Sequence, residues 1–178
     1  MSQMTDRMMR AARLEPDLYE EVEADKSAMG QSMTVVLLAS VAAGIGNMGD
    51  GGFGGIVIGA ILALISWYIW AFLTYFIGTR MLAQPQTSAD MGELLRTTGF
   101  SAAPGVLRIF GFIPLFGGVL TLVVSVWMLI AMIIAVRQAL DYTSTARAIG
   151  VCLIGWFVML FVSLMAAGVA GFFGNAEG

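Results

Sequence analysis

The chain has 178 residues, of which 58% are hydrophobic and only 12% are charged, and its net charge is −3. A soluble domain is about 45–50% apolar and about 25% charged, so this chain cannot hide its apolar side chains in one water-soluble core. The composition excludes an ordinary cytosolic enzyme, a nucleic-acid-binding protein and a disulfide-stabilised scaffold. It predicts a polytopic membrane protein.

The side chains needed for common active sites are scarce. Histidine is absent, and Cys152 is the single cysteine. A disulfide within the chain and a Ser–His or Cys–His catalytic pair are therefore impossible, and zinc and haem sites lose their usual ligands. We predict that the protein is not an enzyme and has no catalytic residue, metal site or cofactor.

Residues 1–26 are predicted to form a cytoplasmic amphipathic arm of two short helices, 3–14 and 16–24. Leu18, Tyr19 and Val22 line one face of the second helix and form the candidate docking face. Each apolar face is too narrow to make a core of its own. We expect the arm to rest on the membrane or on the cytoplasmic loops.

Four uncharged windows are long enough to hold membrane-spanning helices: 27–49, 51–79, 109–136 and 148–176. A spanning helix needs about 20 mostly apolar residues. We predict an all-α transmembrane bundle in residues 27–174, with five spans at 31–46, 53–78, 102–116, 118–137 and 144–174, followed by a tail, 175–178. The short third segment either crosses by thinning the bilayer or is re-entrant.

Between the second and third spans lies a polar stretch with a helix signal. The residues Thr87-Ser88-Ala89-Asp90 fit a capping box, acidic residues follow early, and Gly99 marks the end. We predict a surface helix at 88–98 that lies amphipathically on the membrane.

The basic residues test the five-span topology. With the N-terminus inside, all nine fall on one side, and the other side keeps only Asp50 and Glu177. This is a strong positive-inside pattern. A re-entrant third segment would move Arg137 and Arg147 outside, so the charges favour five full crossings with the C-terminus outside.

Small residues recur every four positions along the second span. They are Gly51, Gly55, Gly59 and Ala63. Such a stripe lets two helices approach closely. It indicates either packing between helices of one chain or a face for self-association.

Arg108 is the charge that falls inside a predicted span. Its side chain either snorkels to the headgroups, pairs with a carboxylate such as Asp141 or Glu20, or serves transport. Arg137 and Asp141 are four residues apart and form a pair if their helix continues. The remaining candidates for contact with anionic headgroups form a predicted basic rim of Arg80, Arg96, Arg137 and Arg147.

Several segments together resemble the bacterial branch of the Yip1 domain family. The first is the run Leu-Glu-Pro-Asp-Leu-Tyr-Glu-Glu-Val-Glu-Ala-Asp at 14–25, which leads into an Ala-rich span. The others are 96–104, 113–118, 126–129, 135–140 and 147–150. Their order and spacing cover about residues 10–172.

The resemblance implies five transmembrane helices with a cytoplasmic N-terminus. Eukaryotic members act in vesicle traffic and interact with Rab-type GTPases. This chain has a short arm and reads Asp-Leu-Tyr-Glu-Glu at 17–21, where the eukaryotic members carry Asp-Leu-Tyr-Gly-Pro. We therefore do not carry the GTPase partner over, and we expect a prokaryotic inner membrane.

Three functions remain open. The first is a scaffold, adaptor or accessory subunit that organises a membrane assembly of other integral proteins or of its own copies, in contact with lipids. The second is lipid handling, as scrambling or sensing of membrane shape. The third is a small-molecule channel or carrier, which the lack of a membrane-buried carboxylate disfavours.

Overall fold

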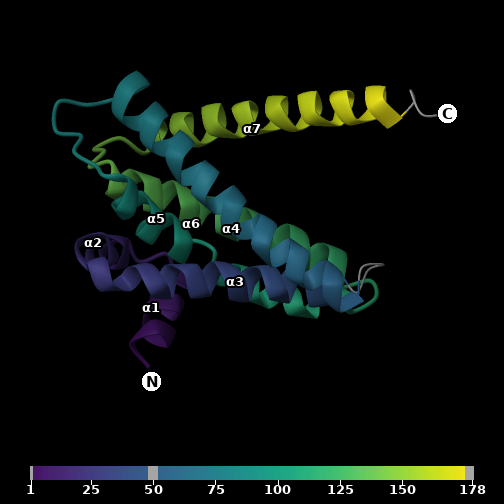
Figure 1. Ribbon diagram of the computed structural model, residues 1–178. Coiled ribbons are helices and arrows are strands. Elements are labelled where there is room, and N and C mark those ends of the chain that lie inside the picture. Colours follow the sequence, from purple (N-terminus) through teal and green to yellow (C-terminus); the bar gives the residue numbers. More distant parts are fainter. Residues whose placement is uncertain (1, 48–51, 175–178) are drawn as a thin grey trace.

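The computed structural model describes residues 2–47 and 52–174, and every regular element in these ranges is helical. The helices are α1 (Gln3–Ala12), α2 (Pro16–Ala24), α3 (Met29–Gly46), α4 (Gly52–Phe76), α5 (Met91–Phe100), α6 (Gly117–Ala139) and α7 (Thr145–Gly174). Two 3-10 helices, η1 (Lys26–Ala28) and η3 (Ala103–Phe112), and a π-helix, η2 (Ile77–Met81), complete them. The predicted all-α class is confirmed (Figure 1). Gly51, Asp50 and the predicted tail 175–178 lie outside the described residues.

Four segments of the described chain are long and apolar enough to cross a membrane. They are Lys26–Gly46, Gly52–Met81, Gly117–Ala139 and Thr145–Met165. These segments coincide with the first, second, fourth and fifth predicted spans. The π-helix η2 extends α4 by more than a turn at its C-terminal end.

The third predicted span, 102–116, contains the shorter apolar helix η3, and α5 precedes η3 in the chain. Both follow α3 in the same direction, because four glycines of α5 and η3 touch α3 in sequence order. The adjacent pairs are Gly92 with Met29, Gly99 with Ser32, Gly105 with Ala39, and Gly111 with Gly46. Ten α-helical residues rise about 15 Å and ten 3-10 residues about 20 Å. Placed end to end they come to about 35 Å, which is longer than the ~30 Å of a hydrocarbon core.

Helix α5 is buried in protein, so the predicted amphipathic helix on the membrane surface is wrong. The helix begins at Met91, after a capping box in which Asp90 Oδ1 accepts from the Glu93 N–H at 2.8 Å and Glu93 Oε2 accepts from the Asp90 N–H at 2.7 Å. Leu94 and Phe100 are fully buried, because α2, α3, α4 and α6 surround the helix. Its apolar face packs on helices and not on lipid.

The N-terminal arm packs on the bundle. Leu18, Tyr19 and Val22 are fully buried in a cluster with Phe100 of α5 and other residues of α3 and α6. At the end of α1, the Ala12 carbonyl accepts a hydrogen bond from Trp127 Nε1 of α6 at 2.8 Å. The predicted docking face is therefore used inside the chain and is closed to an outside partner in this conformation.

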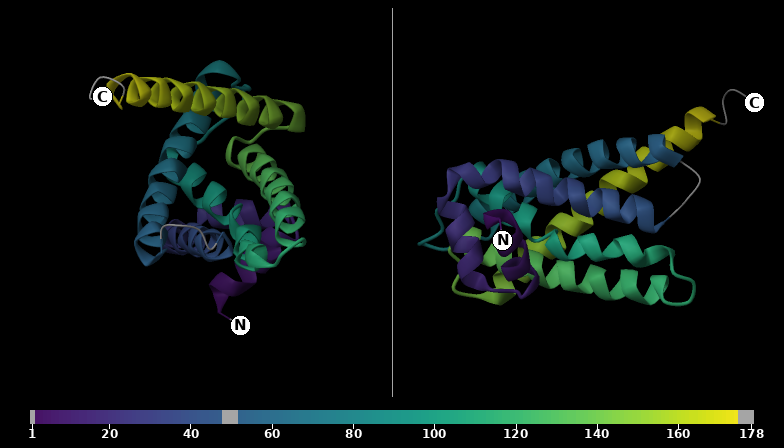
Figure 2. Two further views of the ribbon diagram at one scale, coloured as in Figure 1. Left: turned by 90° about the vertical axis from the view of Figure 1, so that its right-hand side faces the viewer. Right: turned by 90° about the horizontal axis from the view of Figure 1, so that it is seen from below.

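Helix α7 leaves the bundle. It packs on α4, η2 and α6 near its start and then diverges from them, as Figures 1 and 2 show. Elsewhere in the described chain, η3 packs on both α3 and α6.

Candidate functional site

A buried arginine connects the arm to α5. Arg96 of α5 is only 4% exposed, and its guanidinium donates to the carbonyl oxygens of Val22 (2.9 Å) and Glu23 at the end of α2. The α2 carbonyls accept these hydrogen bonds because the last turn of a helix has no internal donors for them. Arg96 therefore does not belong to a basic rim that faces lipid headgroups.

The arm carries the ion pairs of the described chain. Arg7, with a side chain 3% exposed, donates to Glu21 at 2.9 Å and to Asp25 at 2.8 Å. Hydrogen bonds from Ser27 and then from Arg7 lower the pKa of Asp25 to about 2. These contacts lock α1 against α2 and against the start of α3.

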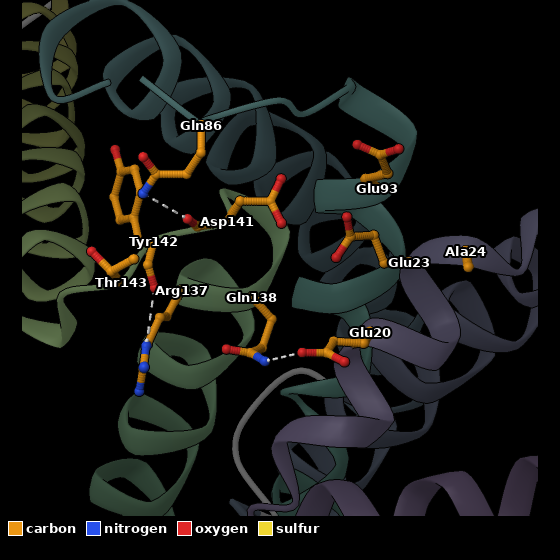
Figure 3. A pocket seen from close by; sticks show the side chains of 10 residues that line it. All are labelled: Glu20, Glu23, Ala24, Gln86, Glu93, Arg137, Gln138, Asp141, Tyr142 and Thr143. Carbon is orange, nitrogen blue, oxygen red and sulfur yellow. Dashed lines mark hydrogen bonds between the residues drawn. The ribbon is translucent and has the colours of Figure 1, made fainter. Parts of the chain in front are cut away.

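An open pocket of about 790 Å³ lies where the arm meets the loops between the spans. Its lining residues come from α2, the 82–90 loop, α5, the end of α6 and the 140–144 loop (Figure 3). They are Glu20, Glu23, Ala24, Gln86, Glu93, Arg137, Gln138, Asp141, Tyr142 and Thr143. We call this the arm pocket.

Four carboxylates surround the arm pocket. Burial, and then the negative charges of Glu93, Asp141 and Glu20, raise the pKa of Glu23 to about 7, against the opposing effect of Arg96. Among the described side chains, no three His, Cys, Asp or Glu residues converge closely enough to hold a metal ion. The arm pocket is thus an acidic surface whose charge changes near neutral pH.

The predicted pair between Arg137 and Asp141 is wrong, because α6 ends at Ala139 before the i,i+4 geometry is complete. Asp141 adopts a left-handed backbone with φ 52°, and Arg137 Nε donates to the Tyr142 carbonyl at 3.2 Å. Arg147 Nη1 donates to the carbonyls of Leu82 and Ala83, both at 3.3 Å. Of the predicted rim, Arg80 and Arg147 are exposed, Arg137 is partly buried and Arg96 is buried.

Tyr142 is a structural residue that the sequence does not single out. Its buried hydroxyl lies between the carbonyl oxygens of Gly78 (2.8 Å) and Leu82 (3.0 Å). The π-helix at 77–81 leaves carbonyls of this kind for an outside donor. A lone tyrosine between two spans carries no sequence signal for this contact. It fixes the two loops at one end of the bundle.

Arg108 lies toward the opposite end, one turn before the end of η3. Its carbonyl oxygen touches Gly46, the last residue of α3, and its Nη2 donates to Ser125 Oγ of α6 at 2.9 Å. The predicted partners Asp141 and Glu20 line the arm pocket at the other end of the bundle, so pairing with them is wrong. Arg108 therefore lies within the membrane domain, away from the arm pocket.

A groove of about 400 Å³ runs beside Arg108, between α3 and α4. Gly55, Gly59 and Ala63 of the predicted stripe line it. A Cβ added at Gly55 or Gly59 would meet nothing within 4 Å, whereas α3 and α4 touch at Gly44 and Ile56. The stripe therefore borders an open groove. The prediction that these glycines pack against another helix of the same chain is wrong for Gly55 and Gly59. We call this the Arg108 groove.

A second membrane pocket, of about 370 Å³, lies at the base of α7. It is lined by apolar side chains of α4, α6 and α7: Trp70, Leu129, Ile133, Ile149, Cys152, Leu153 and Trp156. The Trp70 Nε1 atom is buried there, and no acceptor in the described chain reaches it.

Four helices long and apolar enough to span a membrane, a shorter apolar helix and a packed arm define a multi-pass helical membrane protein. The Yip1 domain family matches the chain over residues 17–167, so the chain belongs to this family and the resemblance seen in the sequence is confirmed. No curated protein and no solved structure matches the chain.

Proposed function

We propose that this Yip1 domain protein is a non-enzymatic organiser of a membrane assembly, acting as a scaffold or accessory subunit. Its partners are other integral membrane proteins. The arm lies on the cytoplasmic side of a prokaryotic inner membrane. The charges support this orientation, because hydrogen bonds between Gln84 and Thr143 and between Gln138 and Glu20 gather the basic loops and the arm at one end.

The observation that carries the proposal is the exposure of α7. Residues 160–165 are all exposed, and six consecutive residues cover more than one full turn of a helix. Phe161 is 65% and Leu164 63% exposed. A helix of a bundle buries at least one face on its neighbours, so this part of α7 is built to pack on something outside the chain or to stand alone in lipid.

The pocket at the base of α7 favours a protein partner. Membrane helices associate largely through packing of their side chains, and the lining of this pocket is apolar. A partner helix lying between α4 and α7 would cover that lining, including Trp70, Leu153 and Trp156.

The test is site-specific photo-cross-linking in native membranes, followed by gentle extraction and mass spectrometry of the intact particle. A photoreactive residue at Phe161 is expected to couple to one defined subunit in stoichiometric amount. The matched control is Val123, an exposed position on α6, which is expected to give lipid adducts. The proposal fails if the chain migrates alone and Phe161 gives only lipid adducts.

Lipid handling is the second candidate function, and the Arg108 groove favours it. Scrambling needs a path along which a polar headgroup moves through the membrane domain. An arginine beside an open groove provides one site on such a path where the headgroup phosphate can bind. Reconstitution into liposomes that contain labelled lipid tests it. A transfer rate equal to that of protein-free liposomes eliminates this candidate.

A further inference from the structure

The Arg108 guanidinium is a charge in the membrane domain that lacks a counter-ion among the described residues. Its hydrogen-bond partner is the neutral Ser125 hydroxyl, its Nε is buried without a partner, and no described carboxylate lines the groove. Ser125 lies eight residues into α6 from Gly117, about 12 Å along the helix axis. A charge without a counter-ion at this depth costs free energy. Binding of an anion beside Arg108 would lower that cost.

The shape of the groove fits a chain and not a small ion alone. Small residues of both helices form its walls, among them Ala39 and Ala43 of α3 and Gly59 of α4. Gly55 and Gly59 are exposed, so the groove opens sideways to the lipid phase. Asn47, at the end of α3, adds a polar group at its outer end.

We propose that the Arg108 groove binds one anionic phospholipid from the leaflet opposite the N-terminal arm. The phosphate accepts hydrogen bonds from the Arg108 guanidinium, and an acyl chain lies over Gly55 and Gly59. An anionic lipid is preferred to phosphatidylcholine, because the described lining offers a cation and no carboxylate for a choline ammonium. A bare apolar helix from a second copy would leave the guanidinium without an anion.

A resident lipid is compatible with either candidate function, so this inference stands or falls independently of the cross-linking and scrambling tests above. The experiment uses the full chain, purified and stripped of lipid in mild detergent. Phosphatidylglycerol or phosphatidylcholine is then added, and bound lipid is counted by native mass spectrometry. The unchanged protein is expected to bind one phosphatidylglycerol in preference to phosphatidylcholine.

Two variants remove the two halves of the site. Arg108→Gln removes the cation, and Gly59→Leu fills the groove. Each is expected to weaken phosphatidylglycerol binding by about tenfold or more, the factor that one charge-assisted hydrogen bond supplies. Arg108→Lys keeps the charge and is expected to restore part of the binding.

The controls match each change. Arg13→Gln removes an arginine whose side chain is 69% exposed on the arm, and Gly54→Leu adds the same side chain on α4 at a position that is also open but does not line the groove. Both are expected to bind as the unchanged protein does. Because the Cβ of Gly59 meets nothing within 4 Å, Gly59→Leu is expected to fold, and circular dichroism checks this.

Three results would overturn the inference. The first is unchanged phosphatidylglycerol binding in Arg108→Gln, and the second is equal binding of phosphatidylcholine by the unchanged protein. The third is a homodimer that Gly59→Leu converts to a monomer with lipid binding intact, which would assign the groove to a second copy.

Discussion

The two ends of the membrane domain are held together in different ways. At the arm end, buried and partly buried polar contacts of Arg7, Arg96 and Tyr142 connect α1, α2, α3, α5 and two loops. Toward the opposite end, close glycine packing joins α3 to η3 and Arg108 bonds to Ser125, while α7 stands away. The polar contacts therefore fix the elements of the arm end relative to one another. The far end keeps exposed surfaces that are free to bind lipid or partner proteins.

The largest expected effect comes from breaking the packing at the far end. A Cβ at Gly46 would lie 1.8 Å from the Arg108 carbonyl oxygen, and a backbone atom cannot move aside without shifting η3. Gly46→Ala is expected to lower the free energy of unfolding by about 3 kcal/mol, measured by denaturation in mixed micelles.

Gly54→Ala is the matched control, because a Cβ there meets nothing within 4 Å. It is expected to stabilise α4 by about 0.5–1 kcal/mol. Equal stabilities of the two variants would show that α3 and η3 do not approach at Gly46.

The next largest effect is expected from breaking the polar contacts at the arm end. Arg96→Met removes the donor for the Val22 and Glu23 carbonyls and is expected to cost about 2 kcal/mol. Local opening of α2, read as faster amide hydrogen exchange at 16–24, is the measurement. Arg80→Met, at an exposed arginine, is expected to leave that exchange unchanged. Uniformly faster exchange over the whole chain would mean that Arg96 supports the bundle and not the arm.

A smaller effect is the pH dependence of the arm. The pKa of Glu23 is raised to about 7 by burial and by its acidic neighbours, so the folded arm favours the protonated carboxyl. Glu23 therefore makes its full contribution to the free energy of unfolding below its ordinary pKa of 4.5, and this contribution is lost as the pH rises through 7. Amide exchange in α2 is therefore expected to be faster at pH 8 than at pH 5.5, in excess of the intrinsic change.

Glu23→Gln is expected to remove that excess. Asp25 has the opposite sign, since its pKa is lowered to about 2 from 3.8, and its contribution is lost only as the pH falls below about 4. An excess that persists in Glu23→Gln would assign the pH effect to another group.

The smallest effect is expected on α7. Phe161→Ala removes a side chain that is 65% exposed, so the purified protein is expected to change by less than about 0.5 kcal/mol. In the native assembly the same variant is expected to weaken recovery of a partner subunit. A loss of several kcal/mol in the purified protein would show that α7 packs within one chain.

The long spans, the arm and the family could be predicted from the amino-acid sequence alone. In lipid, the backbone N–H and C=O groups of a long apolar segment can find hydrogen-bond partners only within a helix. Hydropathy therefore predicts the spans 31–46, 53–78, 118–137 and 144–174. The helix pattern at 16–24 likewise follows from its proline start and apolar spacing. The order of its short segments identified the Yip1 domain family, which the match over 17–167 confirms.

What each apolar face contacts could be seen only once the helices were packed together. Periodicity reports that Leu18, Tyr19, Val22 and Leu94 are on apolar faces, but a face buried in protein and one buried in lipid have the same pattern. The open stripe at Gly55 and Gly59 depends on how α4 packs against α3. The end at which Arg108 lies depends on how α5 and η3 register against α3. That register is set by close contacts at glycines far apart in the sequence, such as Gly111 with Gly46, which no local pattern encodes.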